Sequence, residues 1–221
     1  MFAECNGMRL YYEESGKGRP LLMIHGNGED HTIFNEAVEI LNRTYHCYVL
    51  DSRNHGQSSS ADVLHYSDMA DDVLAFLEQK DLRDVICYGF SDGGIIGMLA
   101  AMKTDRISDL IVSGANLTPA GVQPLFRAKS MFVSLFRKDA KLDLILNEPH
   151  ISDADLAKIH ARTLVLAGSD DLVTERETIA IADGISGATL KILQGEDHGS
   201  YIVHSRKIAD IILGWLSNTG N

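Results

Sequence analysis

Short apolar runs, each separated from the next by a helical pattern, recur along most of this chain. Such runs between turn signals are typical of strands that are covered on both faces, as in a parallel sheet. Their alternation with helices predicts an α/β fold, with a mostly parallel sheet and helices on both faces. An Asn6-Gly7 turn predicts a hairpin in front of this unit. The expected strands are 2–5, 8–13, 21–24, 47–50, 85–88, 110–112, 163–167 and 190–193, and the expected helices are 34–41, 69–79, 95–103, 174–185 and 201–216.

One segment interrupts the alternation. Residues 118–160 carry apolar helical patterns at 125–136 and 142–146 and a third helix that Ser152 caps, with no strand between them. We therefore expect a small helical cap inserted before the penultimate strand. The chain then divides into a core of residues 1–117 and 161–221 and a cap of residues 118–160.

Charge and composition limit the partners. The 221 residues include 31 Asp and Glu against 20 Lys and Arg, a net charge of −11, which argues against nucleic acid or an anionic membrane and leaves a small-molecule substrate. The longest near-apolar run, 95–102, is far shorter than the roughly 20 residues that span a bilayer. Three cysteines without a CxxC pair, and an amino-terminal stretch without a signal-peptide pattern, lead us to expect a cytoplasmic protein.

A serine motif follows the expected strand 85–88. Gly89-Phe90-Ser91-Asp92-Gly93-Gly94 matches G-x-S-x-G between a strand and a helix, the setting of an exposed nucleophile on a sharp turn. Side chains at Gly89 and Gly93 would collide with the neighbouring strand and helix. A dinucleotide-binding turn is disfavoured, because Ser91 stands where that motif needs a glycine. Since neither GxxxxGK[ST] nor HExxH occurs, we predict no cofactor and no metal.

A serine nucleophile needs a base, an orienting carboxylate and donors for an oxyanion. His198 follows the last strand and therefore lies at the same edge of the sheet as Ser91. Asp170 and Asp171 follow the strand before it, and spacing alone does not choose between them. The backbone N–H groups of Asn27, in His25-Gly26-Asn27-Gly28, and of Asp92 are the expected oxyanion donors. We expect His25 to brace this loop.

From end to end, these motifs resemble those of the α/β-hydrolase fold family. Residues 25–28 resemble its H-G-x-G loop, and 51–58 resemble D-x-R-G-x-G-x-S, with Asn54 where glycine is usual. The GFSDGG turn is similar to that of the valacyclovir-hydrolase-like branch. Residues 195–198 resemble the histidine loop, and 168–171 resemble the acid motif G-x-x-D, which selects Asp171.

The resemblance implies a serine hydrolase that works through an acyl-enzyme intermediate. Ser91 attacks a carbonyl, His198 takes and returns the proton, and Asp171 holds the imidazole. Hydrolysis of a small carboxylic ester is the first expectation, and a thioesterase, an amidase or a C–C bond hydrolase would use the same triad. The alternative from another class is a non-catalytic receptor for a small ligand.

Two further expectations concern substrate binding. The cap carries a broad apolar stripe, and at least one of Met131, Phe132 and Phe136 is expected to line the acyl pocket, unless the stripe only seals the cap onto the core. The carboxylate of Asp92 either bonds to a neighbouring loop or faces the pocket, where it would pair with a cationic group such as the amine of an amino-acid ester.

Overall fold

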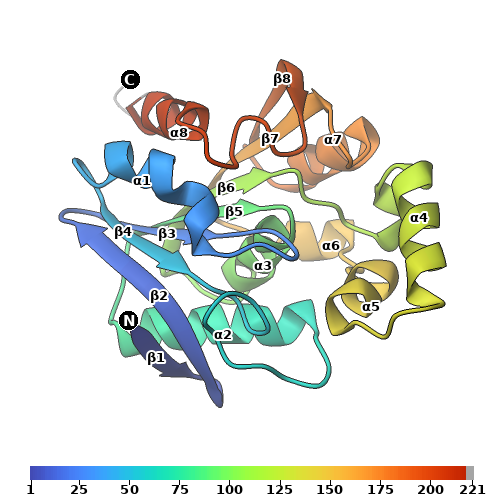
Figure 1. Cartoon of the computed structure of the whole chain (residues 1–221). Coiled ribbons are helices and arrows are strands. Elements are labelled where there is room, and N and C mark those ends of the chain that lie inside the picture. The colour runs from blue at the N-terminus through green and yellow to red at the C-terminus, as the bar shows by residue number, and fades with distance from the viewer. Residues whose placement is uncertain (218–221) are drawn as a thin grey trace.

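An eight-stranded sheet forms the centre of the computed structural model, which describes residues 1–217 (Figure 1). Its order is β1-β2-β4-β3-β5-β6-β7-β8. The pairs β1–β2 and β2–β4 are antiparallel, and all the others are parallel. The strands are β1 (Phe2–Cys5), β2 (Met8–Gly16), β3 (Pro20–Ile24), β4 (His46–Leu50), β5 (Val85–Phe90), β6 (Ile107–Ser113), β7 (Arg162–Asp170) and β8 (Thr189–Asp197).

Helices cover both faces of this sheet. On one face, α2 (Tyr66–Gln79), α3 (Asp92–Ala101) and α7 (Glu175–Gly184) contribute to one apolar cluster. On the other face, the short helix η1 (His31–Phe34), α1 (Asn35–Leu41) and α8 (Lys207–Ser217) build a second cluster. Because helices cover both sides, every residue of β5 is buried, as the continuous apolar run in the sequence predicts.

The connection between β6 and β7 carries the remaining helices. These are η2 (Pro119–Gly121), α4 (Pro124–Ser134), α5 (Ala140–Asn147) and α6 (Asp153–Leu156). Figure 1 shows α4 and α5 to one side of the sheet. The helical insertion therefore lies where the sequence places it, and its treatment as a separate cap of residues 118–160 stays a prediction.

The expected fold class is confirmed, and the last helix differs most at its start. The last helix begins at Lys207 instead of residue 201. His204 adopts a left-handed backbone with φ of 49°, which interrupts the helical path. Tyr201 and Ile202 are nevertheless fully buried. The apolar pattern therefore runs through a buried turn into the helix, and the sequence prediction joins the two into one helix.

Two other sequence features can be placed. All three cysteines are free and buried. Among residues 1–217, no helix is both long enough and apolar enough to cross a membrane.

Candidate active site

Ser91 sits on the turn that joins β5 to α3. Its φ of 53° and ψ of −116° lie outside the regions that ordinary residues prefer. A Cβ atom on Gly89 would lie 2.1 Å from the Gly93 carbonyl oxygen, and one on Gly93 would lie 2.1 Å from the Ile24 carbonyl oxygen. The two glycines are required because β5, α3 and β3 approach so closely here.

His198 connects this serine to a buried carboxylate. Its Nε2 lies 3.1 Å from Ser91 Oγ, and its Nδ1 lies 2.6 Å from Asp171 Oδ1. Asp171 also accepts the backbone N–H of Val173 at 2.9 Å, which fixes the orientation of the carboxylate. Asp170 is exposed, so the structure brings Asp171 to the histidine, as the acid motif indicates.

Sequence reasoning missed the residue that makes room for this histidine. Gly114, directly after β6, has φ of 59°, and a Cβ atom there would lie 2.9 Å from the His198 ring. Phe90 lies on another side of the ring, with centroids 5.0 Å apart. A glycine directly after a strand is the signal that could have identified this position.

Two neutral histidines brace the loop after β3. His25 accepts the Ser52 N–H on Nε2 at 3.0 Å, so its Nδ1 carries the proton and donates to the Gly26 carbonyl at 2.8 Å. His55 likewise accepts the Gly28 N–H on Nε2 at 3.0 Å. Burial lowers the pKa of His25 and lowers the pKa of His55 to about 4. His25 therefore has the bracing contacts that the sequence predicts.

The two expected oxyanion donors lie beside Ser91. Their backbone N–H groups, on Asn27 and Asp92, donate no hydrogen bond to another group within residues 1–217. The side chains of the two residues are joined, since Asn27 Nδ2 donates to Asp92 Oδ2 at 2.8 Å. The Tyr66 hydroxyl donates to the other oxygen, Asp92 Oδ1, also at 2.8 Å.

Asp92 thus has a defined place. It is 5% exposed, and burial raises its pKa, while the hydrogen bonds from Asn27 and Tyr66 act in the opposite direction. Of the two expected arrangements, the structure contains the one in which the carboxylate bonds to neighbouring protein groups, although Asp92 also lines the cavity. Tyr66, at the start of α2, was not among the expected site residues.

A cavity of about 230 Å³ opens in front of Ser91 and His198. The insertion closes one side of it through Phe126, Arg127 and Ser130 on α4 and Ile145 and Leu146 on α5. The remaining lining residues come from the core and the connecting loops; they include Glu29, Asn116, Val122, Leu172 and Val173.

The three expected pocket residues lie elsewhere. Met131, Phe132 and Phe136 are 53%, 64% and 76% exposed, and none of them lines the cavity. The prediction that one of them forms the acyl pocket is therefore corrected. In a helix, residues four apart share a face, so Phe126 and Ser130 line the cavity together. Phe132 lies on another side of α4, and Phe136 lies in the turn that follows the helix.

Carboxylates dominate the charged lining of the cavity. Glu29 accepts the Gly26 N–H on Oε2 at 3.1 Å, and burial raises its pKa. Its Oε1 accepts no hydrogen bond from residues 1–217. Glu148 is held at 2.6 Å from His65 Nδ1 and accepts the Tyr66 N–H at 3.0 Å. Arg127 is the cation of the lining.

One group of side chains away from the cavity has the composition of a metal site. Ligand atoms of Asp30, His31 and Asp51 lie within 4.8 Å of one another. Hydrogen bonds occupy them, since Asp51 Oδ1 accepts the His31 N–H at 2.8 Å and Asp30 Oδ1 accepts the Thr32 N–H at 2.9 Å. These contacts indicate that the cluster stabilises the loops after β3 and β4.

Comparison with known proteins places this geometry in a family. Residues 19–145, more than half of the chain, match the family model of the alpha/beta hydrolase fold. The chain belongs to the alpha/beta hydrolase fold family. The predicted fold family and enzyme class, a hydrolase, are thereby confirmed.

Individual relatives are distant. A putative non-heme chloroperoxidase from Synechocystis is 22% identical, over 94% of this chain and 94% of its own. A pimeloyl-[acyl-carrier protein] methyl ester esterase from Aliivibrio salmonicida is 30% identical over 62% of this chain, which spans about half of that relative's length (51%). Among solved structures, a thermophilic esterase from Thermogutta terrifontis superposes with a TM-score of 0.81 at 22% identity, over 97% of this chain and 95% of that one.

Proposed function

We propose that this α/β-hydrolase cleaves small carboxylic esters through an acyl-enzyme on Ser91. The observation that carries the proposal is the hydrogen-bonded line Asp171–His198–Ser91, with distances of 2.6 Å and 3.1 Å, at the wall of a cavity. A serine, a histidine and a buried carboxylate in this order are the parts of nucleophilic acyl transfer.

The reaction follows from the atoms in place. Ser91 Oγ attacks the ester carbonyl carbon while His198 Nε2 takes its proton, and the imidazolium that forms is stabilised by Asp171. The carbonyl oxygen becomes an oxyanion, to which the N–H groups of Asn27 and Asp92 donate. His198 then protonates the leaving alkoxide. In the second half, His198 deprotonates a water molecule that attacks the acyl carbon, and Ser91 leaves with the proton restored.

Ester hydrolysis is tested with two serines that line the same cavity. Ser91→Ala should abolish labelling by a fluorophosphonate probe and should reduce hydrolysis of nitrophenyl esters to about 10³-fold over the rate in water. Ser130→Ala, on the cavity side of α4, should retain both. If Ser91→Ala keeps most of the activity, or if the probe labels another serine, the mechanism is refuted. A folded protein that turns over no ester, thioester or amide and cleaves no C–C bond beside a carbonyl would instead be a receptor.

The acidic lining supports a preference for esters whose acyl group carries an ammonium. Glu29 is the better partner for such a group, because its Oε1 is free among residues 1–217, whereas both oxygens of Asp92 accept hydrogen bonds. Alanyl and propionyl nitrophenyl esters differ mainly in the amine. Glu29→Gln should lower kcat/KM for the alanyl ester by about tenfold and spare the propionyl ester. Equal effects on both esters would contradict this preference.

A further inference from the structure

Helix α4 has a second side that faces away from the cavity. Leu125, Phe132 and Phe136 are 68%, 64% and 76% exposed, although such side chains are usually buried. Half of the large apolar side chains that are exposed within residues 1–217 lie between residues 125 and 136. They are Leu125, Met131, Phe132, Val133, Leu135 and Phe136. An apolar concentration of this kind marks an interaction site on a soluble domain.

The spacing of these residues makes one continuous stripe. Leu125 and Phe132 are seven residues apart, and Phe136 follows four residues later, so they recur on one side of α4 and of the turn that follows it. The rings of Phe132 and Phe136 lie 5.2 Å apart. We call Leu125, Met131, Phe132, Leu135 and Phe136 the outer face of α4. These residues are exposed and do not line the cavity, which other residues of α4 line.

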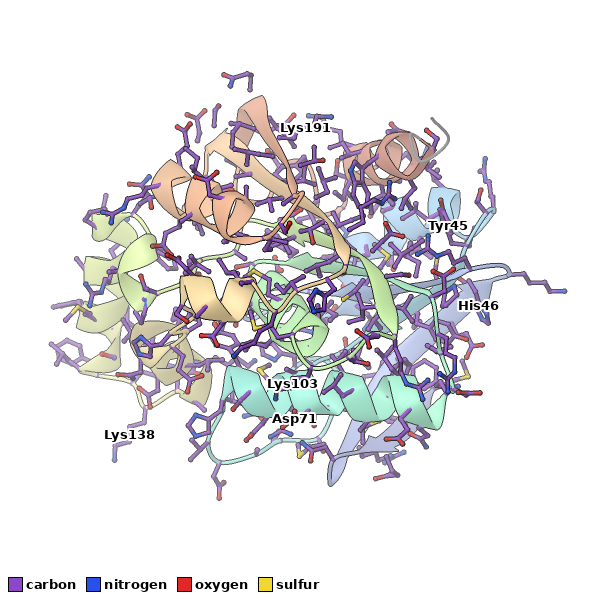
Figure 2. All side chains as sticks on the ribbon, turned by 180° about the vertical axis from the view of Figure 1, so that it is seen from behind. Tyr45, His46, Asp71, Lys103, Lys138 and Lys191 are labelled. Atoms are coloured by element: carbon purple, nitrogen blue, oxygen red, sulfur yellow. The ribbon has the colours of Figure 1, made fainter. Side chains whose placement is uncertain are left out.

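Positive charge accompanies this apolar stripe. Residues 124–141 hold five of the chain's 20 Lys and Arg, of which Arg127 lines the cavity, and only one of its 31 Asp and Glu, in a chain whose net charge is −11. Lys129 and Lys138 are exposed and make no ion pair with residues 1–217, and Arg137 pairs with Asp139 at 3.2 Å. Figure 2 shows Lys138 projecting away from the body of the molecule.

We propose that the outer face of α4 docks onto an anionic lipid surface, with the helix lying in the plane of the headgroups. Aromatic and aliphatic side chains on one face, flanked by lysine and arginine, are the features of an interfacial helix. The basic side chains contact lipid phosphates, and the acidic remainder of the chain turns away from the membrane. The net charge of −11 argues against a membrane partner, but it averages over the whole chain and does not reflect the local excess of lysine and arginine beside α4.

The charges also favour a lipid surface over a second copy of this chain. In a two-fold symmetric pair, the same patch would meet itself, and the basic side chains of one copy would face those of the other. An anionic bilayer presents the opposite charge and an apolar interior together. Because Phe126 and Ser130, on the other side of α4, line the cavity, a docked molecule holds its cavity close to the lipid.

The test measures binding without catalysis, so its failure is distinct from a failure of the proposed ester hydrolysis. The Ser91→Ala protein is sedimented with vesicles of phosphatidylcholine alone or mixed with equal phosphatidylglycerol. It should bind the anionic vesicles, more weakly as salt rises. Phe132→Ser/Phe136→Ser should lower binding at least tenfold, and Lys129→Gln/Lys138→Gln by about tenfold or more.

A matched control lies far from α4. Leu190→Ser/Lys191→Gln changes one exposed apolar and one basic residue on β8, and Figure 2 shows Lys191 far from Lys138. This variant should bind like the parent. In the protein that keeps Ser91, Phe132→Ser/Phe136→Ser should leave the far-ultraviolet circular dichroism spectrum and the hydrolysis of a water-soluble ester unchanged.

Three outcomes overturn the proposal. The first is the absence of binding to anionic vesicles, and the second is equal binding by the α4 variants and the β8 control. The third is a concentration-dependent dimer that the Phe132→Ser/Phe136→Ser variant loses, without vesicle binding, which would make a second copy the occupant.

Discussion

Replacing Tyr66 by phenylalanine isolates one hydrogen bond of the site. The Tyr66 hydroxyl donates to Asp92 Oδ1 at 2.8 Å, and the two residues are 1% and 5% exposed. A hydrogen bond to a charged acceptor contributes about 1.5–3 kcal/mol. The aromatic ring stays in place, so no large cavity forms. We expect the free energy of unfolding at neutral pH to fall by that amount, and the Tm by roughly 2–4 °C for each kcal/mol.

The loss should depend on pH in a defined direction. Burial raises the pKa of Asp92 above its ordinary value, and the Tyr66 hydroxyl lowers it, so the phenylalanine variant has the higher pKa of the two proteins. The folded state then binds more protons than the unfolded state, and the stability contributed by Asp92 falls as pH rises through its folded pKa. The difference between variant and parent should therefore grow as pH rises and shrink in acid.

Urea unfolding, followed by the fluorescence of the single tryptophan, Trp215, measures this effect. Tyr88→Phe is the matched control, because Tyr88 is fully buried and its hydroxyl makes no hydrogen bond of ordinary geometry within residues 1–217. The control should be at least as stable as the parent, to within about 0.5 kcal/mol. A Tyr66→Phe loss no larger than that of Tyr88→Phe, or one that does not change with pH, would refute the reasoning.

Three other predictions test the site and its support. Asp171→Asn should reduce ester turnover by up to about 10⁴-fold, whereas Asp170→Asn, at the exposed neighbour, should retain it. The reverse ranking would show that Asp170 and not Asp171 orients His198. Gly89→Ala should cost more than about 3 kcal/mol in urea unfolding, because its Cβ meets a backbone oxygen at 2.1 Å. Gly214→Ala, in open space on α8, should gain up to about 1 kcal/mol, and similar effects at both glycines would contradict the close-approach argument. The pKa of His55 is about 4 in the folded protein, against an ordinary value of 6.5. As pH falls from 6.5 toward 4, the unfolded state therefore binds a proton that the folded state does not, and the free energy of unfolding falls. His55→Gln should flatten stability across that range by up to about 1.4 kcal/mol per pH unit, and an unchanged slope would assign the acid sensitivity elsewhere.

Much of the fold could be predicted because its signals are local. A strand covered on both faces leaves a continuous apolar run, as at β5, and the serine turn leaves glycines wherever backbone segments approach closely. The placement of His198 beside Ser91 needed one rule of topology, that the carboxyl ends of parallel strands share an edge. The contact distances now place the two residues as that rule predicts.

The remainder depends on contacts between segments that no local pattern connects. Tyr66 reaches Asp92 from another helix, and Gly114 makes room for a ring that lies far along the chain. The apolar stripe of α4 is visible in the sequence, but its periodicity does not state which side meets the cavity. Phe126 and Phe132 are the same residue type on one helix, and only the packing of α4 against α5 and the core distinguishes them.

The contacts of the site join distant parts of the chain. Ser91 and His198 are 107 residues apart, Asn27 and Asp92 are 65 apart, and Asp171 lies 27 before His198. Such non-local contacts form slowly during folding, because the chain loses the entropy of large loops before the contacts stabilise it. Helical signal should therefore recover early after dilution from denaturant, and turnover only when β7 and β8 have joined the sheet. The rate at which turnover recovers then measures the rate of the last step of folding.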